Sequence, residues 1–98
     1  MSKYSELRSN PVKNTITGTP KKVLISLVSC MCDNKNQMVL ESDNDGGYTL
    51  NTCGSAYSNF QFEHSKNDII WEAEDGNWNK VIKMLNSGTS AIESIRVR

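Results

Sequence analysis

Three cysteines and the single histidine are the residues of this sequence best suited to bind a metal. Cys30, Cys32, Cys53 and His64 offer thiolates and an imidazole, the ligands that zinc prefers in four-coordinate sites. Cys30 and Cys32 would share one face of an extended strand. A metal- or thiol-dependent site at these residues is therefore one hypothesis. Because the spacing is not that of a familiar zinc knuckle, buried reduced thiols are the alternative, and we expect no bound metal and no cofactor.

Nucleophilic catalysis requires a base beside the nucleophile and a third group that orients the base. His64 is flanked in the sequence by Glu63 and Ser65. Adjacent residues on a strand point to opposite faces, so these three side chains cannot form a triad among themselves. The chain also lacks a glycine-rich loop of the kind that cradles phosphate. The sequence therefore predicts a protein that is not an enzyme.

The acidic segment around Asp43 resembles part of a calcium-binding loop. If Gly46 takes the place of the loop glycine, Glu41 becomes the first loop residue and Thr52 the last. The bidentate glutamate that closes a calcium loop is then missing. Residues 43–47 read Asp-Asn-Asp-Gly-Gly, a strong signal for a tight turn, so we expect a hairpin here.

The charges of the chain sum to zero but are unevenly distributed. Residues 1–22 carry a net charge of +4, residues 33–75 carry −7, and residues 76–98 carry +3. Such a distribution is compatible with an acidic face that binds a basic partner. The alternative is an acidic face that is only exposed to solvent. Binding of nucleic acid through the basic N-terminal segment is a further hypothesis, although that segment lacks interleaved aromatic residues.

The middle of the chain has the pattern of an antiparallel β-meander of about four strands joined by short turns. In the segment Val23–Cys32 both alternating sets of side chains are largely apolar, which is typical of a central strand covered on both sides. The other predicted strands are Gln37–Ser42, Tyr48–Asn51 and Tyr57–Glu63.

A helical hairpin is predicted over residues 67–88. Ile69, Ile70 and Ala73 would share one face of its first helix, and Asn77 would precede a second helix. That second helix, which Asn77 can cap, carries the i, i+3, i+4, i+7 pattern of an amphipathic helix at Trp78, Val81, Ile82 and Leu85. A fifth strand over Ile69–Glu74 is the alternative for the first helix. Residues 92–97 would form a short strand or a frayed tail.

The sequence of residues 68–88, DIIWEAEDGNWNKVIKMLNSG, resembles the first, capping repeat of an ankyrin array. The resemblance rests on the offsets of six residues: Ala73, Gly76, Asn77, Val81, Leu85 and Gly88. It implies two antiparallel helices joined by a tight glycine turn. The Thr-Pro-Leu-His opening of the family is absent and no second repeat follows, whereas stable arrays need about three repeats. A cap of a larger array and an unrelated hairpin with the same local rules are both compatible with this pattern.

The best candidate for a partner-binding surface is the aromatic and acidic part of the hairpin. It comprises Trp71, Glu72, Glu74, Asp75 and Trp78. Tryptophan is enriched among the residues that dominate binding energy at protein interfaces. We therefore expect a small protein–protein interaction module of the inhibitor, immunity or regulatory adaptor type, whose partner is another protein with a basic surface. Burial in the core is the alternative for both tryptophans.

The 98 residues suit a single α+β domain over residues 21–98, preceded by a flexible or irregular arm over residues 1–20. One helical turn is predicted in the arm at Tyr4–Arg8. The longest apolar run falls short of the ~20 residues that a membrane-spanning helix needs. No export signal is recognisable, so we expect a cytoplasmic location and reduced cysteines.

Overall fold

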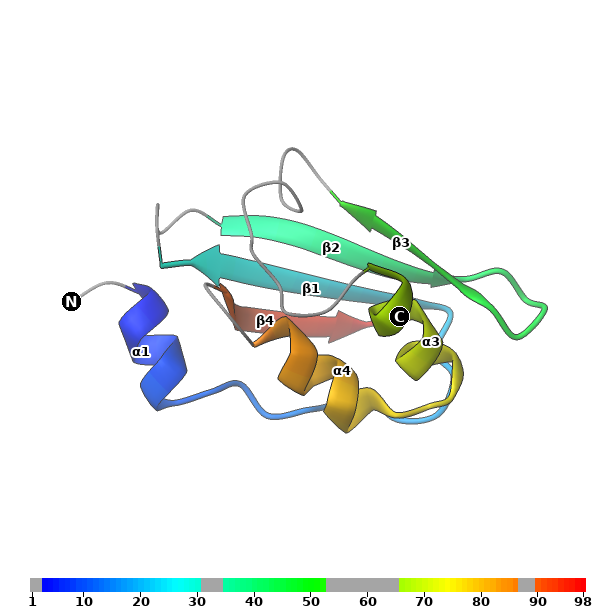
Figure 1. Ribbon diagram of the computed structural model, residues 1–98, viewed down its shortest axis with the longest axis horizontal. Helices are drawn as coiled ribbons and strands as arrows, with labels where there is room; N and C mark the ends of the chain where they lie inside the picture. The colour runs from blue at the N-terminus through cyan, green and yellow to red at the C-terminus, as the bar shows by residue number, and fades with distance from the viewer. Residues whose placement is uncertain (1–2, 31–34, 53–65, 87–89) are drawn as a thin grey trace.

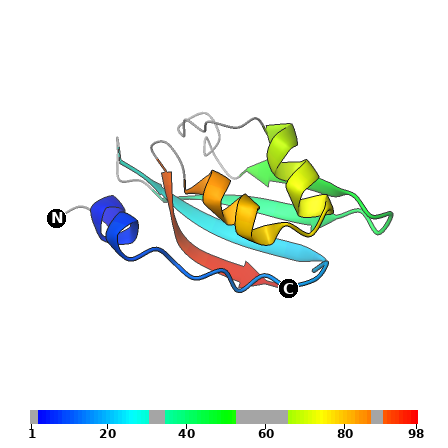
Figure 2. The same ribbon diagram turned by 60° about the horizontal axis from the view of Figure 1, so that its bottom comes forward.

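A computed structural model describes residues 3–30, 35–52, 66–86 and 90–98 of the chain (Figure 1). These residues form a four-stranded sheet and three helices. In chain order the elements are α1 (Lys3–Ser9), β1 (Lys22–Ser29), β2 (Lys35–Ser42), β3 (Tyr48–Thr52), α3 (Lys66–Glu74), α4 (Trp78–Leu85) and β4 (Ser90–Val97). Helices α3 and α4 lie over one face of the sheet, as the two views in Figures 1 and 2 show.

The strands of the sheet follow the order β3-β2-β1-β4, and every neighbouring pair is antiparallel. Ile25, near the centre of β1, lies opposite Met38 of β2 and Ile95 of β4. The predicted fold class, an antiparallel sheet combined with a helical hairpin, is confirmed. The described sheet obtains its fourth strand from β4, after the helices, while the predicted strand Tyr57–Glu63 lies outside the described residues.

The two faces of β1 are buried to different degrees. Val23, Ile25 and Leu27 are fully buried on the face that packs against the helices. On the opposite face, Leu24 and Ser26 are only half-buried, whereas Val28 near the end of the strand is fully buried. The prediction of a central strand is therefore correct in its position in the sheet. Complete cover on both faces was not found, because α3 and α4 lie over one face only (Figure 2).

The predicted helical hairpin is formed by α3 and α4, so the segment Ile69–Glu74 is helix rather than strand. Ile69 and Ala73 are the buried residues of α3. The chain reverses at Gly76, whose φ of +75° is a conformation that glycine adopts without a steric penalty. The backbone N–H of Gly76 donates to the backbone carbonyl of Ala73 over 3.1 Å. The backbone N–H of Asn77 donates to the backbone carbonyl of Glu72 over 2.9 Å.

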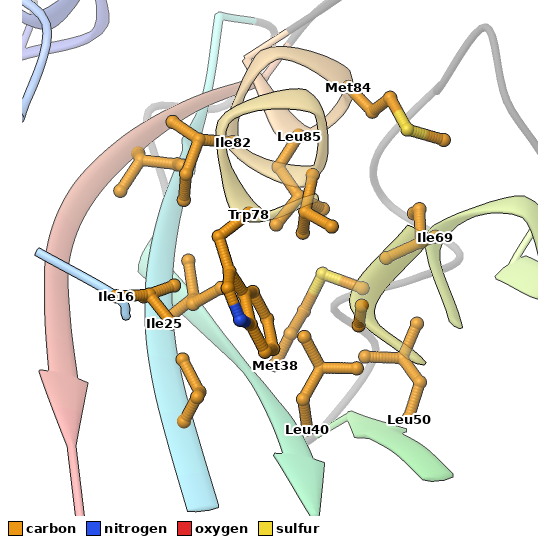
Figure 3. Packing of buried hydrophobic residues seen from close by; sticks show 14 of the residues in the cluster. Ile16, Ile25, Met38, Leu40, Leu50, Ile69, Trp78, Ile82, Met84 and Leu85 are labelled. Carbon is orange, nitrogen blue, oxygen red and sulfur yellow. The ribbon is translucent and has the colours of Figure 1, made fainter. Parts of the chain in front are cut away.

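The core lies between the helices and the inner face of the sheet (Figure 3). The amphipathic pattern predicted for the second helix is confirmed, since α4 buries Trp78, Val81, Ile82, Met84 and Leu85. The indole ring of Trp78 stands edge-on to the ring of Tyr48, with the ring centres 5.5 Å apart. An edge-to-face contact of this kind is favoured by the charge distribution of aromatic rings. Trp78 therefore joins α4 to β3 inside the core.

Residues 10–21 have no regular secondary structure and run beside α4 and β4; we call them the N-terminal strap (Figures 1 and 2). Ile16 of the strap is 3% exposed and belongs to the core. The indole N–H of Trp78 donates to the carbonyl oxygen of Gly18 over 2.8 Å, and the hydroxyl of Tyr48 donates to that of Pro20 over 2.6 Å. The strap thus packs against the same core as the helices, and α1 precedes it.

The two tryptophans provide a matched test of this packing. Trp78 is 3% exposed, whereas Trp71 is 59% exposed. We expect Trp78→Ala to lower the free energy of unfolding by about 3–5 kcal/mol, because it leaves a cavity in the core. Trp71→Ala removes the same side chain from the surface and is expected to change it by no more than about 0.5 kcal/mol. Urea unfolding followed by circular dichroism measures both values, and equal losses would contradict the packing described here.

Candidate functional site

The aromatic and acidic residues predicted to bind a partner are separated by the structure into surface and core. Trp71 is exposed on α3, and it is one of only two large hydrophobic side chains that are exposed in the described part of the chain, the other being Val97. Trp78 lies in the core and has almost no surface with which to contact a partner. A partner-binding surface on the hairpin would therefore be centred on Trp71 alone.

Acidic residues lie within one helical turn of Trp71. Asp68 and Glu74 are three residues away in either direction, and Asp75 is four residues further along the chain. At these spacings side chains on a helix are neighbours on its surface. Glu74 and Asp75 are exposed and Asp68 is half-buried. We call these four residues, Trp71, Asp68, Glu74 and Asp75, the Trp71 surface.

Glu72 holds the hairpin together. Its carboxylate accepts a hydrogen bond from Asn77 Nδ2 over 3.0 Å and forms a 3.3 Å ion pair with Lys80 of α4. The hydrogen bond from Asn77, followed by the interaction with Lys80, lowers the pKa of Glu72 below its ordinary value. Asn77 does not cap α4 with its side chain, because that side chain binds Glu72 instead. Glu72 therefore has a structural role that the sequence pattern did not reveal.

Glu74 connects α3 to the hairpin between β2 and β3. Its Oε2 accepts a hydrogen bond from the backbone N–H of Tyr48 over 3.1 Å. The carboxylates of Glu74 and Asp43 both approach Gly47, where an added Cβ would lie 3.2 Å and 2.6 Å from their nearest oxygens. A side chain at position 47 would therefore displace the two carboxylates, which explains why this residue is glycine.

Asp43 organises the hairpin turn itself, as the sequence predicted for this segment. Its Oδ1 accepts hydrogen bonds from the backbone N–H of Asp45 over 2.8 Å and of Gly47 over 3.0 Å. These two bonds, that from Asp45 first, lower the pKa of Asp43 below its ordinary value. Asn44 and Gly46 have positive φ values of 69° and 88°, which the tight reversal requires.

The cysteine and histidine hypothesis falls mostly outside the described residues. Cys30 follows β1 and is an exposed free thiol. Cys32, Cys53 and His64 lie outside the described part of the chain, so the site stays a prediction. Among the residues that are described, no group of three histidine, cysteine, aspartate or glutamate side chains is arranged to hold a metal ion.

A groove between α4 and the N-terminal segments is a site that the sequence analysis did not predict. It has a volume of about 760 Å³ and is lined by residues of α1, the strap and α4. Its apolar lining comes from Leu7, Pro11, Val12 and Ile82, and its polar lining from Arg8, Asn79, Lys80, Lys83 and Asn86. We call it the α1–α4 groove. Its three basic residues come from the two end segments of the chain that carry net positive charge.

Two hydrogen bonds connect the walls of the groove. Asn14 Nδ2 of the strap donates to Asn79 Oδ1 of α4 over 2.6 Å. Arg8 of α1 donates to the backbone carbonyl of Asn86 just beyond α4. Lys3 of α1 also forms a 2.9 Å ion pair with Glu93 of β4. The predicted basic arm is thus docked on the domain at Lys3 and Arg8, and two of its charges are already engaged.

Comparison of the chain with protein-family models, with curated proteins and with solved structures finds no match. The resemblance of residues 68–88 to an ankyrin cap therefore stays a prediction. Within the described residues, no helix has both the length and the apolar character needed to cross a membrane.

The hydrogen bonds of Asp43 predict a pH dependence. A carboxyl group whose pKa is lowered in the folded state stabilises the fold when ionised, and this contribution is lost as pH falls through the folded pKa. The contribution of Asp43 should therefore be present above its ordinary pKa of 3.8 and disappear at lower pH. We expect Asp43→Asn to lower the free energy of unfolding near neutral pH, and the difference from wild type to shrink below about pH 4. Urea unfolding at a series of pH values measures this.

Asp45→Asn is the control, since it removes the same charge from the same turn. If both variants changed the pH dependence equally, the hydrogen bonds accepted by Asp43 would not be its cause.

Proposed function

We propose that this protein is a small, non-enzymatic interaction module that binds another protein through the Trp71 surface. The observation that carries the proposal is the 59% exposure of Trp71 on a helix whose neighbouring positions hold Asp68, Glu74 and Asp75. A large exposed aromatic ring has a cost in water that contact with a partner would remove. Tryptophan also loses little conformational freedom on binding, because it has only two rotatable side-chain bonds.

The charge around Trp71 defines the chemistry of the partner. Three carboxylate residues within one turn would attract a surface rich in lysine or arginine and would disfavour acidic surfaces. An arginine of the partner could also stack on the indole ring, where a cation is attracted to the aromatic face. The proposed partner is therefore a protein with a basic patch, as expected for an inhibitor, immunity protein or regulatory adaptor.

The engagement of the neighbouring carboxylates supports a binding role over a catalytic one. Glu74 accepts the Tyr48 N–H, and Glu72 is held by Asn77 and Lys80. The lowered pKa of Glu72 is the opposite of what a general acid working near neutral pH needs. These groups act as ties that fix α3, and with it Trp71, against the sheet and α4.

Affinity capture with the full chain tests this proposal. The immobilised wild type and its variants are incubated with extract of the native host at moderate salt, and the bound proteins are quantified by mass spectrometry. We expect a partner whose retention falls about thirtyfold on Trp71→Ala, the effect of losing about 2 kcal/mol at an interface hot spot. Asp75→Lys should weaken retention too, because it reverses an exposed charge beside Trp71.

The choice of charge variants follows from the structure. Reversal of Glu72 or Glu74 would also break the contacts that hold α3, so Asp75 is the informative position. Glu6→Lys on α1 is the control, since it makes the same charge change at an exposed position outside the Trp71 surface. No retained macromolecule, or a partner retained equally by all variants, would disprove the proposal. Sedimentation of the purified chain shows whether the partner is a second copy, which carries its own basic groove.

A further inference from the structure

We propose that the α1–α4 groove is a binding site for a small amphipathic organic anion, with an apolar chain or ring and a single carboxylate. This site is separate from the Trp71 surface, because none of the residues that line the groove belongs to that surface. The proposal rests on the shape of the groove, on its apolar lining and on the basic residues beside that lining.

The size and lining of the groove suit a small molecule. Sites for small ligands are typically hollows of roughly 300–1,000 Å³ with a mainly apolar lining and a few polar groups. The groove has a volume of about 760 Å³, and Leu7, Pro11, Val12 and Ile82 supply apolar surface from both of its walls. Helix α1 buries none of its own residues in the core. The apolar side of Leu7 is therefore available to a ligand.

The charges around the groove select an anion. Arg8, Lys80 and Lys83 all line it, and its other polar residues, Asn79 and Asn86, are uncharged. Lys80 is partly neutralised by its ion pair with Glu72. The guanidinium group of Arg8 binds the carbonyl of Asn86 and keeps its positive charge. Lys83 is exposed, and within the described residues it has no ion-pair partner.

The arrangement of these residues on α4 explains why the ligand must be amphipathic. Ile82 and Lys83 are adjacent in the sequence. Asn79, three residues before Ile82, and Asn86, four residues after it, lie on the same side of the helix as Ile82. An apolar body over Ile82 and Leu7 would therefore place an attached carboxylate within reach of the Lys83 ammonium group. A neutral apolar molecule would fill the same space but leave Lys83 without a counter-charge from the described residues.

Titration with decanoate at neutral pH, below its micellar concentration, tests the proposal. The full isotope-labelled chain is observed by two-dimensional ¹H–¹⁵N NMR. We expect saturable shifts of amide signals in residues 7–12 and 79–86, and smaller effects on the outer strand β3. Decanol, which has the same chain without the charge, should bind about fivefold more weakly, since it lacks the ion pair with the basic residues.

Two variants and a control assign the binding to the groove. Lys83→Glu should weaken decanoate binding about fivefold or more, because attraction becomes repulsion. Leu7→Gln should weaken it about threefold, because apolar contact is lost from a helix that buries nothing in the core. Lys21→Glu makes the same charge change as Lys83→Glu at an exposed residue outside the groove and should leave the affinity unchanged.

Several outcomes would overturn the proposal. They are the absence of saturable shifts, equal binding of decanoate and decanol, and equal effects of Lys83→Glu and Lys21→Glu. A parallel titration with lipid vesicles distinguishes binding of the free anion from binding to a lipid surface. If the same residues shifted only with vesicles that contain phosphatidylglycerol, and not with decanoate, the site would recognise a membrane and the proposal would be wrong.

Discussion

The indole ring of Trp78 is the point at which three parts of the molecule meet. Its ring stands edge-on to Tyr48 of β3, and its N–H donates to Gly18 of the N-terminal strap. A buried indole needs a partner for its N–H, and only a backbone carbonyl brought in from the strap supplies it here. Because Tyr48 in turn binds Pro20, the same aromatic pair fixes the end of the strap in two places. The position of the strap, and hence one wall of the α1–α4 groove, depends on this pair.

A net charge of zero conceals two surfaces of opposite character. The acidic residues around Trp71 lie on α3 and at the start of the turn that follows it, while Arg8, Lys80 and Lys83 line the groove on α1 and α4. The Glu72–Lys80 ion pair lies between them and joins the two helices of the hairpin. An exposed ion pair of this kind stabilises the fold only slightly. The orientation of α3 relative to α4, and therefore of one surface relative to the other, is set mainly by the buried packing of Ile69 and Ala73 with α4 and by the turn at Gly76.

Local patterns in the sequence predicted most of the secondary structure, and they failed where the answer depends on distant residues. The spacing of Trp78, Val81, Ile82 and Leu85 identified α4 and its buried face, and Asp43 with its glycines identified the hairpin. The groove was not predictable in this way, because Leu7 and Ile82 are far apart in the sequence and are brought together by tertiary contacts, among them those of Arg8 with Asn86 and of Lys3 with Glu93. The roles of Glu72 and Glu74 were missed for a similar reason, since an acidic residue on a helix gives no sign of the donor it meets. The hypothesis about the cysteines and His64 depends mostly on residues outside the described part of the chain.

The position of β4 beside β1 has a consequence for how the chain folds. β1, β2 and β3 follow one another and can pair through short turns, but β4 follows both helices in the chain, so its pairing with β1 closes a loop that contains all the elements between them. Contacts between residues as far apart as Val23 and Val97 close slowly, because a long loop must be ordered before they form. Until then the central strand has an unpaired edge rich in valine, leucine and isoleucine. Refolding at high concentration should therefore favour pairing between different molecules over completion of the sheet.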